Sequence, residues 1–62
     1  MKKLNELPKG ALFYYEGKQY VKRLELGTGR TSCIIIGGIH TELDDNTPVE
    51  WNGDVWPLVT IH

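Results

Sequence analysis

The sequence predicts an all-β protein, a small antiparallel barrel of five or six short strands in one domain spanning residues 1–62. Turn-forming sequences rich in glycine, proline and asparagine recur at short intervals. Between these turns lie runs of four to nine residues rich in aromatic and β-branched side chains, as is typical of strands. No window longer than ten residues repeats its apolar residues with a helical period.

Residues 1–9 are expected to be a short lead-in, with at most one helical turn over residues 3–7 that Pro8 ends. A two-residue turn at Glu16-Gly17 then defines the first hairpin. It pairs Tyr15 with Lys18, Tyr14 with Gln19, Phe13 with Tyr20 and Leu12 with Val21. Opposed residues share a face, because side chains alternate along each strand. The predicted core face carries Ala11, Phe13, Tyr15, Tyr20, Leu24 and Leu26, with Lys18 and Lys22 at intervals. The other face carries Leu12, Tyr14, Gln19, Val21, Arg23 and Glu25.

Two later turns complete the predicted strand order. Gly37-Gly38 is read as a second two-residue turn, which places Ile36 opposite Ile39, Ile35 opposite His40 and Cys33 opposite Glu42. The strand over residues 32–36 is apolar enough to be central in the sheet. Asn52-Gly53 is expected to join a strand at 49–51 to one at 55–56. Pro57 has no N–H to donate, so the last segment is expected to be an edge strand or to be bulged there.

The charged residues are distributed unevenly along the chain. The net charge of −1 argues against generic nucleic-acid binding. All seven lysines and arginines lie at or before position 30, together with three acids, whereas five acids and no lysine or arginine follow. If the two parts are also separate in space, the basic part would attract an anion, or two copies would meet through opposite charges. The alternative is a chance scatter of charges over a solvated surface.

The small size of the chain predicts self-association. A chain of this length buries only roughly 60% of the surface that its unfolded form exposes. Cys33 is the only cysteine, which excludes an internal disulfide and points to a reducing compartment. We therefore predict a homo-oligomer that gains buried area between its subunits.

No segment indicates secretion or a membrane. The basic segment Met1-Lys2-Lys3 is not followed by the apolar run of a signal peptide. The longest aliphatic run, Ile34-Ile35-Ile36, is too short to cross a bilayer. The expected location is the cytoplasm of the producing cell or of a host cell, without a membrane partner.

Catalysis and metal binding have little support in the sequence. Ser32 and Cys33 are candidate nucleophiles and His40 and His62 candidate bases, but the predicted register does not place Cys33 opposite His40. Cys33 is expected to be a buried small apolar residue. Residues 40–45 offer nitrogen and oxygen ligands without a second histidine or cysteine at zinc spacing and without a calcium loop. We therefore predict no enzyme activity, no metal and no cofactor.

Two surface features are candidate binding sites. In Gly27-Thr28-Gly29-Arg30, backbone N–H groups and a guanidinium could cradle a phosphate, although the spacings of a P-loop and of a dinucleotide fingerprint are missing. A flexible hairpin loop is the other interpretation. Leu12, Tyr14 and Val21 form an apolar patch suited to a subunit interface, a partner protein or a stacked base. Closure of a barrel would instead bury that patch.

Two short motifs carry a resemblance to known proteins. Residues 7–20 follow L-P-x-G-x-x-F-x-x-x-G-x-x-Y, and residues 45–50 follow D-x-T-x-V-E. Together they resemble the short, uncharacterised small β-barrel accessory proteins of bacteriophages and prophages. The resemblance covers about residues 7–50 and rests on turn and core positions, so it implies a fold and no site residues. It also implies a viral protein that neutralises a component of its host.

These observations predict a non-enzymatic accessory protein that sequesters a small anionic, nucleotide-like ligand of host immune signalling. The predicted ligand-binding residues are Arg23 and Arg30 for phosphate, Gly27 and Gly29 in the loop, Tyr14 or Trp51 for stacking and His40 for a hydrogen bond. The alternative is a host-defence inhibitor that docks on a host enzyme. It would use the patch of Leu12, Tyr14 and Val21 or an exposed edge strand.

Overall fold

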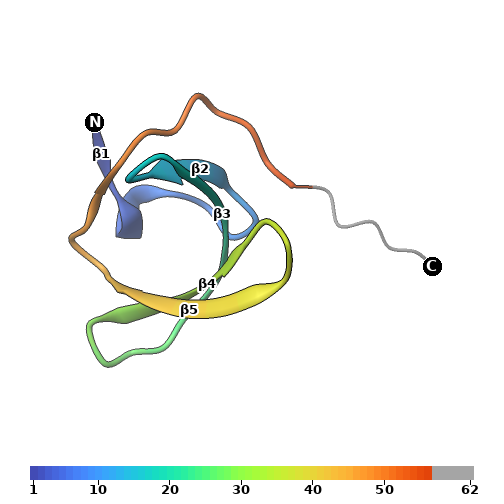
Figure 1. Cartoon of the computed structure of the whole chain (residues 1–62). Helices are drawn as coiled ribbons and strands as arrows, with labels where there is room; N and C mark the ends of the chain where they lie inside the picture. The colour runs from blue at the N-terminus through green and yellow to red at the C-terminus, as the bar shows by residue number, and fades with distance from the viewer. Residues whose placement is uncertain (57–62) are drawn as a thin grey trace.

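The fold is given by a computed structural model, which describes residues 1–56 and consists mainly of antiparallel strands (Figure 1). In chain order the elements are β1 (Lys2–Lys3), the 3-10 helix η1 (Leu4–Glu6), β2 (Leu12–Tyr15), β3 (Lys18–Glu25), β4 (Arg30–Ile35), β5 (Ile39–Asp44) and β6 (Pro48–Val49). Strands β2 to β5 form a four-stranded sheet in chain order, and β1 pairs with β6 separately. The predicted all-β class is confirmed, whereas the sheet over residues 1–56 is not closed into a barrel.

The first hairpin, β2–β3, has the predicted register. Tyr15 lies opposite Lys18 and Phe13 opposite Tyr20. Glu16 and Gly17 both have positive φ, 51° and 79°, as a two-residue hairpin turn of type I′ requires. The opposed rings of Phe13 and Tyr20 stack with their centroids 5.4 Å apart. A local turn signal and one cross-strand aromatic pair therefore fix the start of the sheet.

A β-bulge interrupts β3 at Arg23. Lys22 is opposite Cys33 and Leu24 is opposite Ser32, so Arg23 is an extra residue on β3. Beyond a bulge the alternation of side chains continues on the other face. Leu24 is therefore 57% exposed, and Leu26 is exposed too. The prediction that these two leucines belong to the core face is wrong, because it assumed an unbroken strand.

The β4–β5 hairpin differs from the predicted register by one residue. Ile35 lies opposite Ile39 and Ile34 opposite His40, whereas the prediction placed Ile36 and Ile35 there. The Gly38 N–H donates to the Ile35 carbonyl at 2.9 Å, so the loop contains Ile36 as well as the two glycines. Because Ile36 belongs to the loop and not to β4, Ser32 rather than Cys33 faces Glu42. The central position of β4, between β3 and β5, is confirmed.

The predicted hairpin at Asn52-Gly53 does not form within the described chain. Residues 50–56 instead run antiparallel to β2 and the residues before it. Their backbone hydrogen bonds join Glu50 to Tyr14 in both directions, the Leu12 N–H to the Asp54 carbonyl and the Trp56 N–H to the Gly10 carbonyl. Val49 pairs with Lys2. The pairing of 49–51 with 55–56 is therefore wrong, because both segments have partners elsewhere, and Pro57 lies outside the described residues.

The core lies on the concave side of the sheet and includes the N-terminal residues. Its buried apolar side chains are Leu4, Leu7, Ala11, Phe13, Tyr20, Cys33 and Val49. The expected single helical turn is confirmed as η1. Lys22, only 2% exposed, donates from Nζ to the Leu4 carbonyl at 3.1 Å and the Leu7 carbonyl at 2.6 Å. Its ammonium also contacts Glu25 at 2.8 Å. Among residues 1–56, no helix is long and apolar enough to cross a membrane.

Candidate functional site

The predicted phosphate loop is held by contacts within the sheet. Gly27 and Gly29 have φ of 78° and 88°, and the loop closes the β3–β4 hairpin. The Gly29 carbonyl accepts from the Asp45 N–H at 2.9 Å. Arg30 Nη2 donates to the Glu42 carbonyl at 3.0 Å, and its Nε lies 3.5 Å from Glu42 Oε1. The guanidinium is therefore already engaged with β5, as expected for a residue that closes a hairpin.

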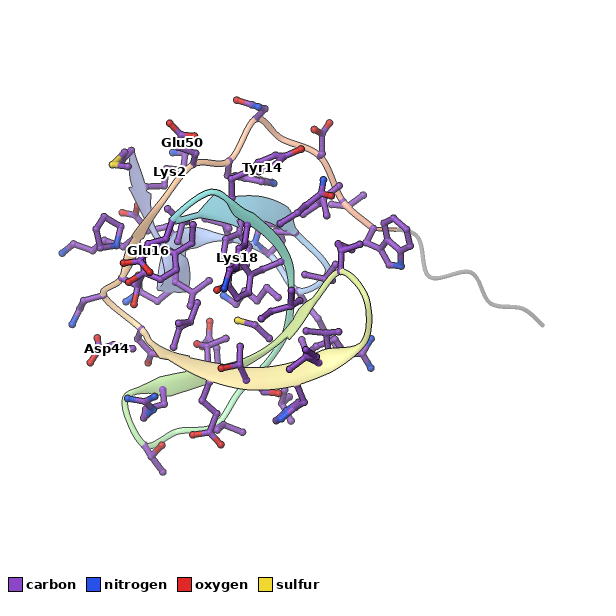
Figure 2. All side chains as sticks on the ribbon, viewed as in Figure 1. Lys2, Tyr14, Glu16, Lys18, Asp44 and Glu50 are labelled. Carbon is purple, nitrogen blue, oxygen red and sulfur yellow. The ribbon has the colours of Figure 1, made fainter. Side chains whose placement is uncertain are left out.

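The two predicted stacking residues lie elsewhere. Tyr14 Oη accepts from Gln19 at 2.9 Å, and Trp51 Nε1 donates to the Asp54 carbonyl at 2.7 Å. Figure 2 shows Tyr14 and Asp44, which lies at the end of β5, on opposite sides of the molecule. Asp44 lies opposite Arg30 in the β4–β5 ladder, so Tyr14 and Arg30 do not form one site.

The hollow beside Tyr14 is lined by two acidic residues, Glu16 and Glu50. This hollow of about 430 Å³ is lined by Met1, Tyr14, Tyr15, Glu16, Gly17, Pro48 and Glu50. The negative charge of Glu16 raises the pKa of the neighbouring Tyr15 hydroxyl, with desolvation as a smaller cause. The same charge would oppose a phosphate group placed nearby.

The structure brings Ser32 and His40 together, which the predicted register had kept apart. Ser32 Oγ and His40 Nε2 lie 2.5 Å apart on the convex face of β4 and β5. A serine–histidine contact is the first part of an activated nucleophile, which also needs a group that orients the histidine and donors for an oxyanion. Within residues 1–56, the other ring nitrogen has no hydrogen-bond partner that would orient the imidazole. The contact joins the neighbouring strands β4 and β5 as a cross-strand polar pair. His62 lies outside the described residues.

Cys33 is buried, as predicted, and lies opposite Thr41 rather than Glu42. Burial raises the pKa of its thiol to about 11, and the charge of Lys22 only partly offsets this. A thiol with so high a pKa carries little of the nucleophilic thiolate at neutral pH. Cys33 is therefore a core side chain.

The acids near the end of β5 hold a turn. Asp45 Oδ1 accepts from Thr31 Oγ1 at 2.6 Å, and Asp44 Oδ1 accepts from the Asn46 N–H at 2.8 Å. No group of three or more histidine, cysteine or acidic side chains gathers as metal ligands within residues 1–56. These carboxylates thus stabilise the connection between β5 and β6.

The predicted patch of Leu12, Tyr14 and Val21 is not one exposed surface. Val21 is only 4% exposed and Leu12 is half-buried, while Tyr14 is exposed. Val21 lies opposite Ile34 and contributes to a different feature, a groove of about 230 Å³. We call it the Trp56 groove. It is lined by Val21, Arg23, Ile34, Ile35, Ile36, Gly37, Gly38 and Trp56.

The Trp56 groove combines apolar walls with one positive charge. Trp56 is 46% exposed, and Ile36 is exposed at the β4–β5 loop. Arg23, carried by the bulge in β3, is exposed, and the described chain contains no ion pair for it. Arg23 is thus the only predicted ligand-binding residue that lines this groove. Sequence reasoning missed the groove because Trp56 reaches it only through the pairing of residues 50–56 with β2.

Comparison with known proteins gave no match to any family model, curated protein or solved structure. Function is therefore inferred from the chemistry of the groove and of the strand edges.

Proposed function

We propose that this protein is a non-enzymatic binding protein that docks on a partner protein through the Trp56 groove. The observation that carries the proposal is an apolar hollow with the guanidinium of Arg23 at its wall, which has no ion-pair partner within residues 1–56. The matching ligand is an extended segment that presents an aliphatic or aromatic side chain next to a carboxylate. Tryptophan and arginine are the residues most often responsible for binding energy at protein interfaces.

From the size of the groove we expect a short peptide to bind it with measurable affinity. Burying a leucine or phenylalanine side chain is worth about 1.5–3 kcal/mol. A charge-assisted hydrogen bond from Arg23 to a carboxylate adds about 1.5–3 kcal/mol where water is partly excluded. These values correspond to millimolar binding of a short peptide, because a dissociation constant of 1 mM equals about 4.1 kcal/mol.

A small anionic ligand is the second candidate, and one observation favours it. Trp56 and Arg23 line the same groove, so a base stacked on the indole would leave its phosphate near the guanidinium. Against it, Arg30 contacts Glu42, and Tyr14 and Trp51 lie outside the groove. A phosphate in the groove would therefore lie near Arg23 alone, whereas the sequence predicted that both Arg23 and Arg30 bind it.

The biological setting remains the one that the motifs at residues 7–20 and 45–50 imply. In a phage or prophage accessory protein, the partner would be a host protein in the cytoplasm, and docking would inhibit it. This setting is part of the proposal and adds no residue to the groove.

The proposal is tested by NMR titration of the full ¹⁵N-labelled chain with two capped tetrapeptides, Asp-Leu-Phe-Asp and Lys-Leu-Phe-Lys. The acidic peptide should shift the indole N–H signal of Trp56 and the amides of Ile34 and Ile36. The indole of Trp51 donates to the Asp54 carbonyl and is the internal reference. Arg23→Glu should reverse the preference between the peptides. Lys18→Glu makes the same charge change at an exposed β3 position outside the groove and should not.

Three outcomes would count against docking of an acidic segment. The first is no shift with either peptide at concentrations of about 10 mM, at which a dissociation constant of a few millimolar leaves most of the protein bound. The second is a shift confined to Trp51 and Tyr14. The third is saturable binding of AMP or a cyclic dinucleotide at Trp56 with no response to the peptides, which would favour the anionic ligand. Such a ligand at 100 times its Kd should stabilise the fold by about 2.7 kcal/mol.

A further inference from the structure

The outer edge of β5 is unpaired within the described chain. β5 is the last strand of the four-stranded sheet, and β1 and β6 pair with each other instead. Natural proteins usually protect such an edge with lysine, proline or a bulge. β5 has the sequence Ile-His-Thr-Glu-Leu-Asp and a regular ladder to β4, so it has no lysine, proline or bulge, and its acidic residues are Glu42 and Asp44. Its first residue, Ile39, is 65% exposed.

We propose that β5 pairs antiparallel with β5 of a second copy of this chain. A two-fold axis beside Thr41 would join the two four-stranded sheets into one continuous sheet. The surface used is the edge of β5, so this inference is independent of the partner proposed for the Trp56 groove.

The sequence of β5 is self-complementary about Thr41. With Thr41 opposite the partner's Thr41, His40 lies opposite the partner's Glu42, and Ile39 lies opposite the partner's Leu43. The two-fold axis repeats each of these pairs. The convex face then gains two imidazole–carboxylate pairs, and the core face gains two aliphatic pairs. Both kinds of directly opposed pair stabilise antiparallel strands.

Neighbouring registers are worse. An axis beside Glu42 places the two Glu42 carboxylates opposite each other, and like charges in that position are destabilising. An axis beside His40 pairs the two imidazoles and sets Ile39 against the partner's Thr41. An offset of a single residue joins the core face of one sheet to the convex face of the other. The Thr41 register is therefore the one that the residues of β5 select.

The first test measures mass against concentration by sedimentation equilibrium of the full chain. Between about 10 µM and 1 mM the mass should rise from one chain of 7.1 kDa towards two, as a modest interface predicts. His40→Glu sets carboxylates against each other twice and should weaken the dimer about tenfold or more. The double variant His40→Glu/Glu42→Lys creates two ion pairs and should restore it. Asn52→Glu adds the same charge at an exposed position away from β5 and should have no effect.

The second test determines the register by disulfide cross-linking. It uses a Cys33→Ala background, because Cys33 lies opposite Thr41 within one chain. Directly opposed Cβ atoms lie about 4.5–5.5 Å apart, near the span of a disulfide. Thr41→Cys should therefore form a covalent dimer on mild oxidation, whereas His40→Cys and Glu42→Cys should not.

The proposal is overturned by a monomer at every concentration, or by cross-linking at position 40 or 42 in preference to 41. Ile39→Lys is a second seam variant that should remain folded, because Ile39 is largely exposed. Its circular-dichroism spectrum should match that of the wild type. A folded Ile39→Lys chain that dimerises as well as the wild type also contradicts the proposed seam.

Discussion

At the scale of single residues, Lys22 shows how a charged side chain can organise a small core. The ammonium is buried, and its hydrogen bonds reach two carbonyls of the N-terminal segment and the carboxylate of Glu25. Burying an ammonium is tolerated only when such partners replace its water. Lys22 therefore holds η1 against the sheet, which places Leu4 and Leu7 in the core.

Replacing Lys22 with methionine should destabilise the fold strongly. The variant keeps the length of the side chain but leaves the Leu4 and Leu7 carbonyls without their donor. Each unsatisfied buried group costs about 1–3 kcal/mol, so the free energy of unfolding should fall by about 2–4 kcal/mol. Urea denaturation followed by tryptophan fluorescence measures this. Lys18→Met, at an exposed position, should change little, and equal stabilities of the two variants would contradict the role given to Lys22.

Cys33 makes stability depend on pH in the alkaline range. Its thiol has a pKa of about 11 in the fold, against an ordinary value of 9.0. The raised pKa means that the unfolded chain loses this proton first. The contribution of this thiol to the free energy of unfolding is complete below pH 9. It is lost as pH rises towards 11, by at most about 1.4 kcal/mol per pH unit. Cys33→Ala should flatten the decline relative to the wild type in denaturation at pH 8 to 11. Parallel curves would contradict the shift.

At the scale of elements, loop length determines which residues face each other. The Glu16-Gly17 turn contains two residues and leaves the alternation of β2 and β3 in the register that the sequence suggests. The β4–β5 loop contains three, which moves His40 onto the same face as Ser32. The bulge in β3 has a comparable effect, because it turns Leu24 outwards and sets Arg23 beside the groove.

The Glu16-Gly17 turn provides a paired test of this view. Glu16 has φ of 51°, a left-handed conformation that asparagine adopts more readily than glutamate. Glu16→Asn should therefore stabilise the protein, by about 0.5 kcal/mol. Gly17→Ala should destabilise it by about 1–2 kcal/mol, since a Cβ is strained in that region. In both thermal and urea unfolding, Glu16→Asn should raise the stability and Gly17→Ala should lower it. A stability change of the same sign in the two variants would rule out a type I′ turn.

At the scale of the whole molecule, the charged parts of the sequence are interleaved in space. Basic β3 and acidic β5 belong to one sheet with β4 between them. Arg30 from the first part contacts Glu42 from the second. The lysines and arginines therefore do not form a separate basic half of the molecule that would steer an anion.

The proposed dimer also has a consequence at this scale. A chain of this length has marginal stability alone, and pairing of β5 edges adds buried area without a disulfide. Because only folded chains associate, the thermal midpoint of the wild type should rise with protein concentration. That of Ile39→Lys should not.

The sequence by itself determined the all-β class, the β2–β3 register, the single turn before Pro8 and the burial of Cys33. These features follow from local signals, namely period-two alternation, a two-residue turn and a small apolar side chain. Of the residues that line the Trp56 groove, it identified Arg23 as a ligand-binding residue and Val21 as part of an apolar patch. Tertiary structure decided the bulge, the length of the β4–β5 loop, the pairing of residues 50–56 with β2 and the burial of Lys22. The physical reason is that each of these depends on hydrogen-bond partners distant in sequence, and local patterns do not specify which partner a backbone group finds.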